Sequence, residues 1–195
     1  MSKPELHAEI DLTIARTFIA EMVDYLKAEV LYWPITRSQP LGDKMPQLTI
    51  GGLLEAIVRA EAAQNDLTPD QRAELQSIRA EHDRLASDRP VAYGNKAARE
   101  INSRLDAWSQ YLDDAARKPA DVAAYYPHEV RARAKAYLLA QQIERDLPQN
   151  VRQRLALLDT RLRPLFKAGA FVWDDRLQAA FPPQPCWWLY GRLPD

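Results

Sequence analysis

The fold of this 195-residue chain is decided first by residues 5–32, which read ELHAEIDLTIARTFIAEMVDYLKAEVLY. Apolar side chains recur there every three or four residues, the spacing that places them along one side of an α-helix. Two such rows are Leu6, Ile10, Ile14, Phe18, Met22 and Tyr25, and Leu12, Ile19, Val23, Leu26 and Val30. Two rows make a wide apolar arc, so we expect a long central helix that other helices cover on more than one side.

The composition of the whole chain favours the same class of fold. Ala (29) and Leu (24) together outnumber Val, Ile and Thr (23) more than two to one, which favours helix over strand. The chain has only 6 glycines, no Asn-Gly or Asp-Gly pair, and no sustained alternation of apolar and polar residues. We therefore predict an all-α protein, a single domain over residues 1–195 in which about six helices form an irregular bundle around the first one.

Residues 68–117 carry the clearest local signal in the chain, a helix start at Thr68-Pro69-Asp70-Gln71. Thr at the cap position, Pro at the first helical position and Gln three residues after Thr make a capping box. Two narrow apolar seams of matching spacing follow, which are Leu75, Ile78, His82 and Leu85, and Ile101, Leu105, Trp108 and Leu112. Arg89-Pro90 and Gly94-Asn95 separate the seams, so we expect an antiparallel helical hairpin that can project from the bundle, with its second helix starting at Lys96.

Residues 164–195 differ in kind, because large aromatic side chains alternate there with prolines. The aromatic residues of this segment are Phe166, Phe171, Trp173, Phe181, Trp187, Trp188 and Tyr190. So much apolar area does not stay in water, and two arrangements remove it. The extended tail either wraps onto its own bundle and closes the core, or it docks onto a partner, with Trp187, Trp188 and Tyr190 as the partner-binding residues.

Residues 127–167 form the basic part of the chain, with 9 basic and 4 acidic side chains and a net charge of +5. A solvated surface, or ion pairs with acidic residues of the same molecule, is one interpretation of this excess. The alternative is a site for nucleic acid or another polyanion. Its candidate residues are Arg131, Lys135, Arg152, Arg154 and Arg161.

Histidines offer the clearest route to a ligand or metal site in a helical bundle. Arg79 stands three residues before His82, and Tyr125 stands three before His128, so the Glu-x-x-His motif of di-iron bundles is missing. His82 occupies a seam position where Leu is expected, which favours a partly buried imidazole hydrogen-bonded across the hairpin, with a pH-sensitive contact as the alternative. A small-ligand or metal-binding enzyme would need His82 and His128 to converge with Tyr125 or Tyr126 in one pocket.

Cys186 is the single cysteine, so the chain can form neither an internal disulfide nor a multi-cysteine zinc site. Its neighbours Pro185, Trp187 and Trp188 predict apolar surroundings, which keep a thiol protonated and unreactive. The chain has no run of about 18 apolar residues, and its start lacks the apolar stretch of an export signal. We therefore expect a cytoplasmic protein that crosses no membrane.

The motifs of common enzymes, which include the P-loop, the nucleophile elbow and the Rossmann glycines, do not occur in the sequence. Lys and Arg total 26 and Asp and Glu total 27, a net charge of -1 that argues against general attraction to nucleic acid or to anionic membranes. We hypothesise a non-catalytic interaction or scaffold protein that requires no cofactor and binds a protein partner or a second copy of itself.

Overall fold

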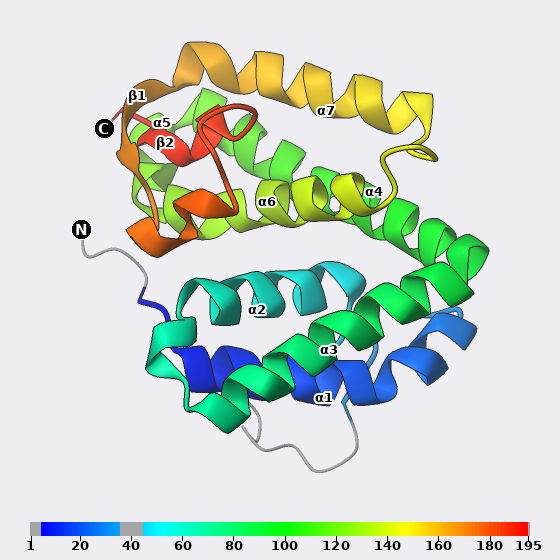
Figure 1. Cartoon of the computed structure of the whole chain (residues 1–195). Coiled ribbons are helices and arrows are strands. Elements are labelled where there is room, and N and C mark those ends of the chain that lie inside the picture. The colour runs from blue at the N-terminus through cyan, green and yellow to red at the C-terminus, as the bar shows by residue number, and fades with distance from the viewer. Residues whose placement is uncertain (1–4, 36–44, 195) are drawn as a thin grey trace. The chain divides into compact units, whose positions relative to one another are not determined.

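The fold is all-α, as the sequence predicts, in a computed structural model that describes residues 5–35 and 45–194 (Figure 1). The helices are α1 (Ala8–Lys27), α2 (Ile50–Ala62), α3 (Pro69–Asp88), α4 (Pro90–Arg117), the short α5 (Pro119–Val122), α6 (Tyr126–Gln142) and α7 (Gln149–Leu162). Within the described ranges, strands form a single two-stranded antiparallel sheet of β1 (Lys167–Phe171) and β2 (Tyr190–Arg192). None of the helices described is both long enough and apolar enough to span a lipid bilayer.

The chain divides into two compact units, each with its own buried side chains. The N-terminal unit is Leu6–Glu100, and the C-terminal unit is built mainly from Ile101–Asp195. The boundary between them falls inside α4.

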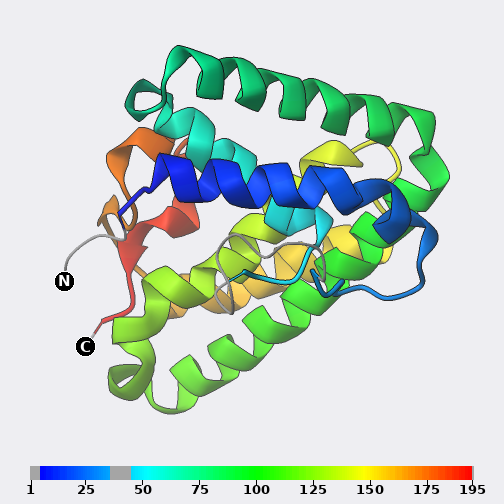
Figure 2. The same cartoon turned by 90° about the horizontal axis from the view of Figure 1, so that it is seen from below.

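In the N-terminal unit, α1 lies beside both α2 and α3 (Figure 1 and Figure 2). The side chain of Phe18 on α1 is fully buried, and its ring lies so close to Gly52 that a Cβ there would be 3.1 Å away. An ion pair between Arg59 on α2 and Asp11 on α1, with 2.9 Å between nitrogen and oxygen, links the same two helices. The wide apolar arc of α1 therefore packs against two neighbouring helices, except at Ile10, which is 44 % exposed.

The helix α1 is shorter than residues 5–32, because it ends at Lys27. The chain after it is extended and supplies carbonyl groups to a side chain of α4. Lys96 Nζ donates to the carbonyl oxygens of Ala28 and Val30 at 2.6 and 2.8 Å. These bonds satisfy two backbone acceptors of the segment that follows the helix, so tertiary contacts override the local helical pattern.

The predicted capping box at Thr68 is present, and the structure corrects where the second helix of the expected hairpin begins. Gln71 accepts from the backbone N–H of Thr68 at 2.8 Å and its own backbone N–H donates back to the Thr68 hydroxyl at 3.3 Å. The second helix begins at Pro90 and not at Lys96, so Gly94 lies inside α4. The helix α3 packs along α1 and α2, with ion pairs Arg16–Glu74 and Arg79–Glu61, and meets α4 where His82 bonds to the hydroxyl of Tyr93.

In the C-terminal unit, the helices are joined by ion pairs and by an aromatic core. Arg133 on α6 donates to both carboxylate oxygens of Asp159 on α7, each at 2.9 Å. Trp108 on α4 is fully buried and stacks on Tyr111 with 5.5 Å between ring centroids. Tyr126, at the start of α6, lies beside both rings.

The C-terminal segment packs onto its own unit, which is the first of the two arrangements expected from the sequence. Trp188 is fully buried, and its carbonyl oxygen accepts a hydrogen bond from the hydroxyl of Tyr126. Trp173 Nε1 donates to the carbonyl oxygen of Pro127 at 2.7 Å. The buried aromatic side chains of this segment are Phe171, Trp173, Phe181 and Trp188. The tail is therefore part of the core.

Gly191 in β2 occupies a position that no larger residue fits. Its φ is +158°, and a Cβ built on it would lie 2.3 Å from the carbonyl oxygen of Lys167 and 2.6 Å from the ring of Phe166. The strand β1 and the aromatic side chain before it approach the backbone of β2 this closely only because residue 191 has no side chain.

We predict that Gly191→Ala lowers the free energy of unfolding by about 2 kcal/mol or more, because the methyl group overlaps backbone and ring atoms. Gly94→Ala is the matched control, since nothing lies within 4 Å of a Cβ at that helical position. The control should stabilise the protein by roughly 0.5–1 kcal/mol. Urea unfolding followed by circular dichroism measures both changes, and an unchanged midpoint for Gly191→Ala contradicts the steric argument.

Deletion of Pro185–Asp195 should unfold the C-terminal unit, because it removes the buried Trp188 and the whole of β2. Loss of one buried Trp side chain alone costs about 3–5 kcal/mol, a large part of the stability of a small domain. Near-ultraviolet circular dichroism and urea unfolding of the full-length and shortened chains test this. A shortened chain that unfolds as cooperatively and at the same urea concentration as the parent would show that the tail is not core.

Candidate functional site

The strongest candidate site is an open hollow of about 370 Å³ on the C-terminal unit, which we call the aromatic hollow. Its lining residues are Arg163, Phe166, Ala168, Pro183, Trp187 and Tyr190. Trp187 and Tyr190 are only half-buried there, so aromatic surface remains available at the rim. An exposed group of aromatic side chains is typical of a binding surface.

The geometry around Trp187 fixes the orientation of its indole ring. The ring of Phe166 meets it edge to face, with 5.4 Å between the ring centroids. The guanidinium of Arg163 lies over the Trp187 ring at 4.5 Å from its centroid, a cation–π contact. Two neighbours therefore hold the ring in place while part of it stays in contact with solvent.

The adjacent tryptophans have opposite roles because the chain turns between them in the short 3₁₀-helix η6 (Trp187–Leu189). Trp188 points into the core, where Tyr137 meets it edge to face at 6.2 Å and the guanidinium of Arg133 lies 4.8 Å from its ring centroid. Tyr190 is fixed by its hydroxyl, which donates to the carbonyl oxygen of Phe181 at 2.8 Å. The burial of Trp188 thus positions the two partly exposed aromatic residues on either side of it.

Of the three aromatic residues predicted to bind a partner, the structure places Trp187 and Tyr190 at the hollow and Trp188 in the core. Sequence reasoning did not include Arg163, Phe166, Ala168 and Pro183, which complete the lining. For the first three, distance along the chain from Trp187 explains the omission, since the pairing of β1 with β2 brings residues 163–168 beside residues 187–190.

The five residues predicted to bind a polyanion are distributed over α6 and α7 and are largely engaged within the chain. Arg154 pairs with Asp106 at 2.5 Å, and Arg161 pairs with Asp113. Arg152 donates to the carbonyl oxygens of Glu144 and Leu147 at the turn before α7. Arg131 and Lys135 are half-buried on α6. Much of the basic charge of residues 127–167 is therefore matched by acidic or carbonyl groups of the same unit.

The two histidines proposed as ligand or metal residues lie in different units. His82 is 1 % exposed, and its two ring nitrogens lie 2.8 Å from Asp83 Oδ1 and 2.8 Å from the hydroxyl of Tyr93. Burial lowers the pKa of His82 below its ordinary value, and the neighbouring carboxylate of Asp83 offsets part of that effect. His128 is exposed at the start of α6. Among the residues that the structure describes, no three His, Cys, Asp or Glu side chains gather in a way that could hold a metal ion.

The two tyrosines of the enzyme hypothesis also have different surroundings. Tyr125 is 63 % exposed, whereas Tyr126 is buried with its hydroxyl bonded to the carbonyl of Trp188. Cys186 is fully buried, and burial raises the pKa of its thiol to about 11, in agreement with the predicted protonated state. Neither Tyr126 nor Cys186 is therefore poised as an accessible nucleophile or base.

The chain matches no known protein-family model, no curated protein and no solved structure.

The neutral state of His82 predicts a pH dependence of stability. Its pKa is lower in the folded protein than the ordinary value near 6.5, so the unfolded chain binds the proton more readily. The free energy of unfolding should therefore fall as the pH is lowered from about 6.5 toward the folded-state pKa, by at most about 1.4 kcal/mol per pH unit. His82→Gln, which can still bond to Tyr93 but does not titrate, should remove this part of the pH dependence.

His128→Gln is the matched control for this measurement, because it replaces an exposed histidine on α6 and leaves the contacts of His82 in place. Thermal unfolding of the three proteins between pH 7.5 and 5.5 gives the comparison. If His82→Gln loses as much stability as the parent protein when the pH is lowered, His82 is not the source of this pH dependence.

Proposed function

We propose that this protein is a non-catalytic binding protein and that the aromatic hollow of its C-terminal unit docks a protein partner. The observation that carries the proposal is the contrast between the two adjacent tryptophans. Trp188 is fully buried, whereas Trp187 keeps part of its ring at the rim of an open hollow with Tyr190. If the pair served the core alone, folding would favour burying both rings.

The composition of the hollow supports this function. Trp, Tyr and Arg are the residues that most often dominate the binding energy of protein interfaces, and all three occur here as Trp187, Tyr190 and Arg163. The ring of Trp187 is already held by Phe166 and Arg163, so little side-chain freedom is lost when a partner binds. A preorganised aromatic surface of this kind binds more tightly than a mobile one of equal area.

The other two hypotheses from the sequence have less support. A polyanion site at residues 127–167 would have to compete with the ion pairs Arg154–Asp106 and Arg161–Asp113. An enzyme using His82 would have to reach an imidazole that is 1 % exposed and already bonded on both sides. Binding at the aromatic hollow requires neither the breaking of these ion pairs nor the exposure of His82.

Substitution of Trp187 tests the proposal. Trp187→Ser should leave the protein folded and weaken capture of its partner from the native source at least about tenfold, the effect typical of a central interface aromatic residue. Tyr125→Ser is the matched control, since Tyr125 is an exposed aromatic residue of the same unit outside the hollow. Quantitative pull-down measures capture, circular dichroism checks folding, and analytical ultracentrifugation tests whether the partner is a second copy of the chain.

Loss of the same partner by Trp187→Ser with retention by Tyr125→Ser supports the proposal. Equal capture by both variants would refute it. So would the absence of both a captured partner and self-association for the parent protein.

A further inference from the structure

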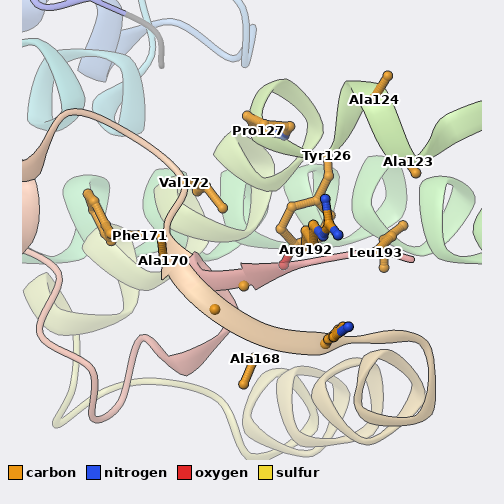
Figure 3. A pocket seen from close by; sticks show the side chains of 13 residues that line it. Ala123, Ala124, Tyr126, Pro127, Ala168, Ala170, Phe171, Val172, Arg192 and Leu193 are labelled. Atoms are coloured by element: carbon orange, nitrogen blue, oxygen red, sulfur yellow. The ribbon is translucent and has the colours of Figure 1, made fainter. Parts of the chain in front are cut away.

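The C-terminal unit has a second hollow, of about 710 Å³, which we call the strand hollow. It lies between the turn that leads into α6 and the sheet of β1 and β2. Figure 3 shows Tyr126 and Pro127 on the helical side and Ala168, Ala170 and Arg192 on the strand side. Its volume lies within the range of sites that hold small molecules. It shares only Ala168 with the aromatic hollow, so it is a separate candidate site.

Most of the strand hollow is apolar. Phe171, Val172 and Leu193 line it together with Pro127 and several alanines. The hydroxyl of Tyr126, the one uncharged polar side chain of the lining, already donates to the carbonyl oxygen of Trp188. The wall therefore suits a ligand body that makes no hydrogen bonds of its own.

Among the residues that the structure describes, the charged side chains that line the strand hollow are two cations, Lys167 and Arg192. They are directly opposite each other in the register of the sheet, and both are exposed. Like charges at opposed positions of an antiparallel pair repel each other. Within the part of the chain that the structure describes, neither one forms an ion pair with an acidic side chain.

This arrangement contrasts with that of three arginines in the same unit, each of which has an acidic partner on another helix. Arg133, Arg154 and Arg161 are each paired with an aspartate of another helix. At Lys167 and Arg192 the chain instead places two positive charges together at the edge of an apolar cavity. An anionic group between them would remove the repulsion and accept charge-assisted hydrogen bonds from both.

We propose that the strand hollow binds a small amphiphilic carboxylate, a molecule with an apolar body and one carboxylate group. The apolar body lies against Phe171, Val172 and Leu193, and the carboxylate lies between Lys167 and Arg192. A carboxylate matches the bidentate guanidinium of Arg192, and a single anionic group matches a lining in which all other side chains are uncharged. The side chains at positions 168 and 170 are small and exposed, so the ligand can enter over β1.

Isothermal titration calorimetry of the full chain with sodium decanoate tests this proposal. We expect one decanoate per chain, bound at least about tenfold more tightly than nonyltrimethylammonium, which has the same alkyl tail and the opposite charge. Sodium acetate, which has the carboxylate but no apolar body, should bind at least about tenfold more weakly than decanoate.

Variants then locate the binding site. Lys167→Gln and Arg192→Gln should each weaken decanoate binding about fivefold, and the double variant should weaken it more than about tenfold. Ala170→Phe should reduce binding by filling the strand hollow from an exposed position that does not line the aromatic hollow. Arg145→Gln is the matched control, because Arg145 is an exposed basic residue of the same unit that lines neither hollow.

Four results would overturn the proposal. Three come from the titrations of the parent protein: decanoate does not bind saturably, the two charged amphiphiles bind equally well, or acetate binds as tightly as decanoate. The fourth comes from the variants: the decanoate affinity is unchanged in the double variant or in Ala170→Phe. None of these results depends on whether a protein docks at Trp187, so the two proposals can fail separately.

Discussion

The burial of Trp188 is the interaction on which the C-terminal unit depends. The tail returns to the helices through this side chain, which lies against Tyr137 and Arg133, while its backbone carbonyl accepts from Tyr126. The indole N–H of Trp188 has no hydrogen-bond partner, which costs about 1–3 kcal/mol. Removing a buried Trp side chain costs about 3–5 kcal/mol, so the apolar contacts of the ring outweigh that penalty.

The positions of both candidate sites depend on the burial of Trp188. Trp187 and Tyr190 are close neighbours of Trp188 in sequence, and their positions at the aromatic hollow are set by where it is buried. The strand β2 begins at Tyr190 and pairs with β1, which brings Arg192 opposite Lys167. The absence of a side chain at Gly191 allows that pairing, because any Cβ there would overlap the backbone of Lys167. The same short segment therefore closes the core and forms two surfaces.

Buried polar side chains of the N-terminal unit connect neighbouring segments of that unit. Glu100 is fully buried and accepts from the N–H of Gly51 at 2.9 Å, at the positive end of the α2 dipole. Lys96 bonds to the carbonyls of Ala28 and Val30, and His82 bonds to Tyr93. These buried groups have partners within the unit, so they stabilise the fold and leave little free chemistry for a ligand.

Local patterns in the sequence were sufficient to predict the helical class, the cap at Thr68 and the unreactive environment of Cys186, because each depends on residues that are close along the chain. The end of α1 at Lys27, the packing of α3 on α1 and α2, and the opposite roles of Trp187 and Trp188 depend on contacts between distant residues. Periodicity records which side of a helix is apolar but not which neighbour covers it. For that reason the sequence alone determined which residues had to leave water, and only the tertiary structure decided which of them remain at a surface where they can bind.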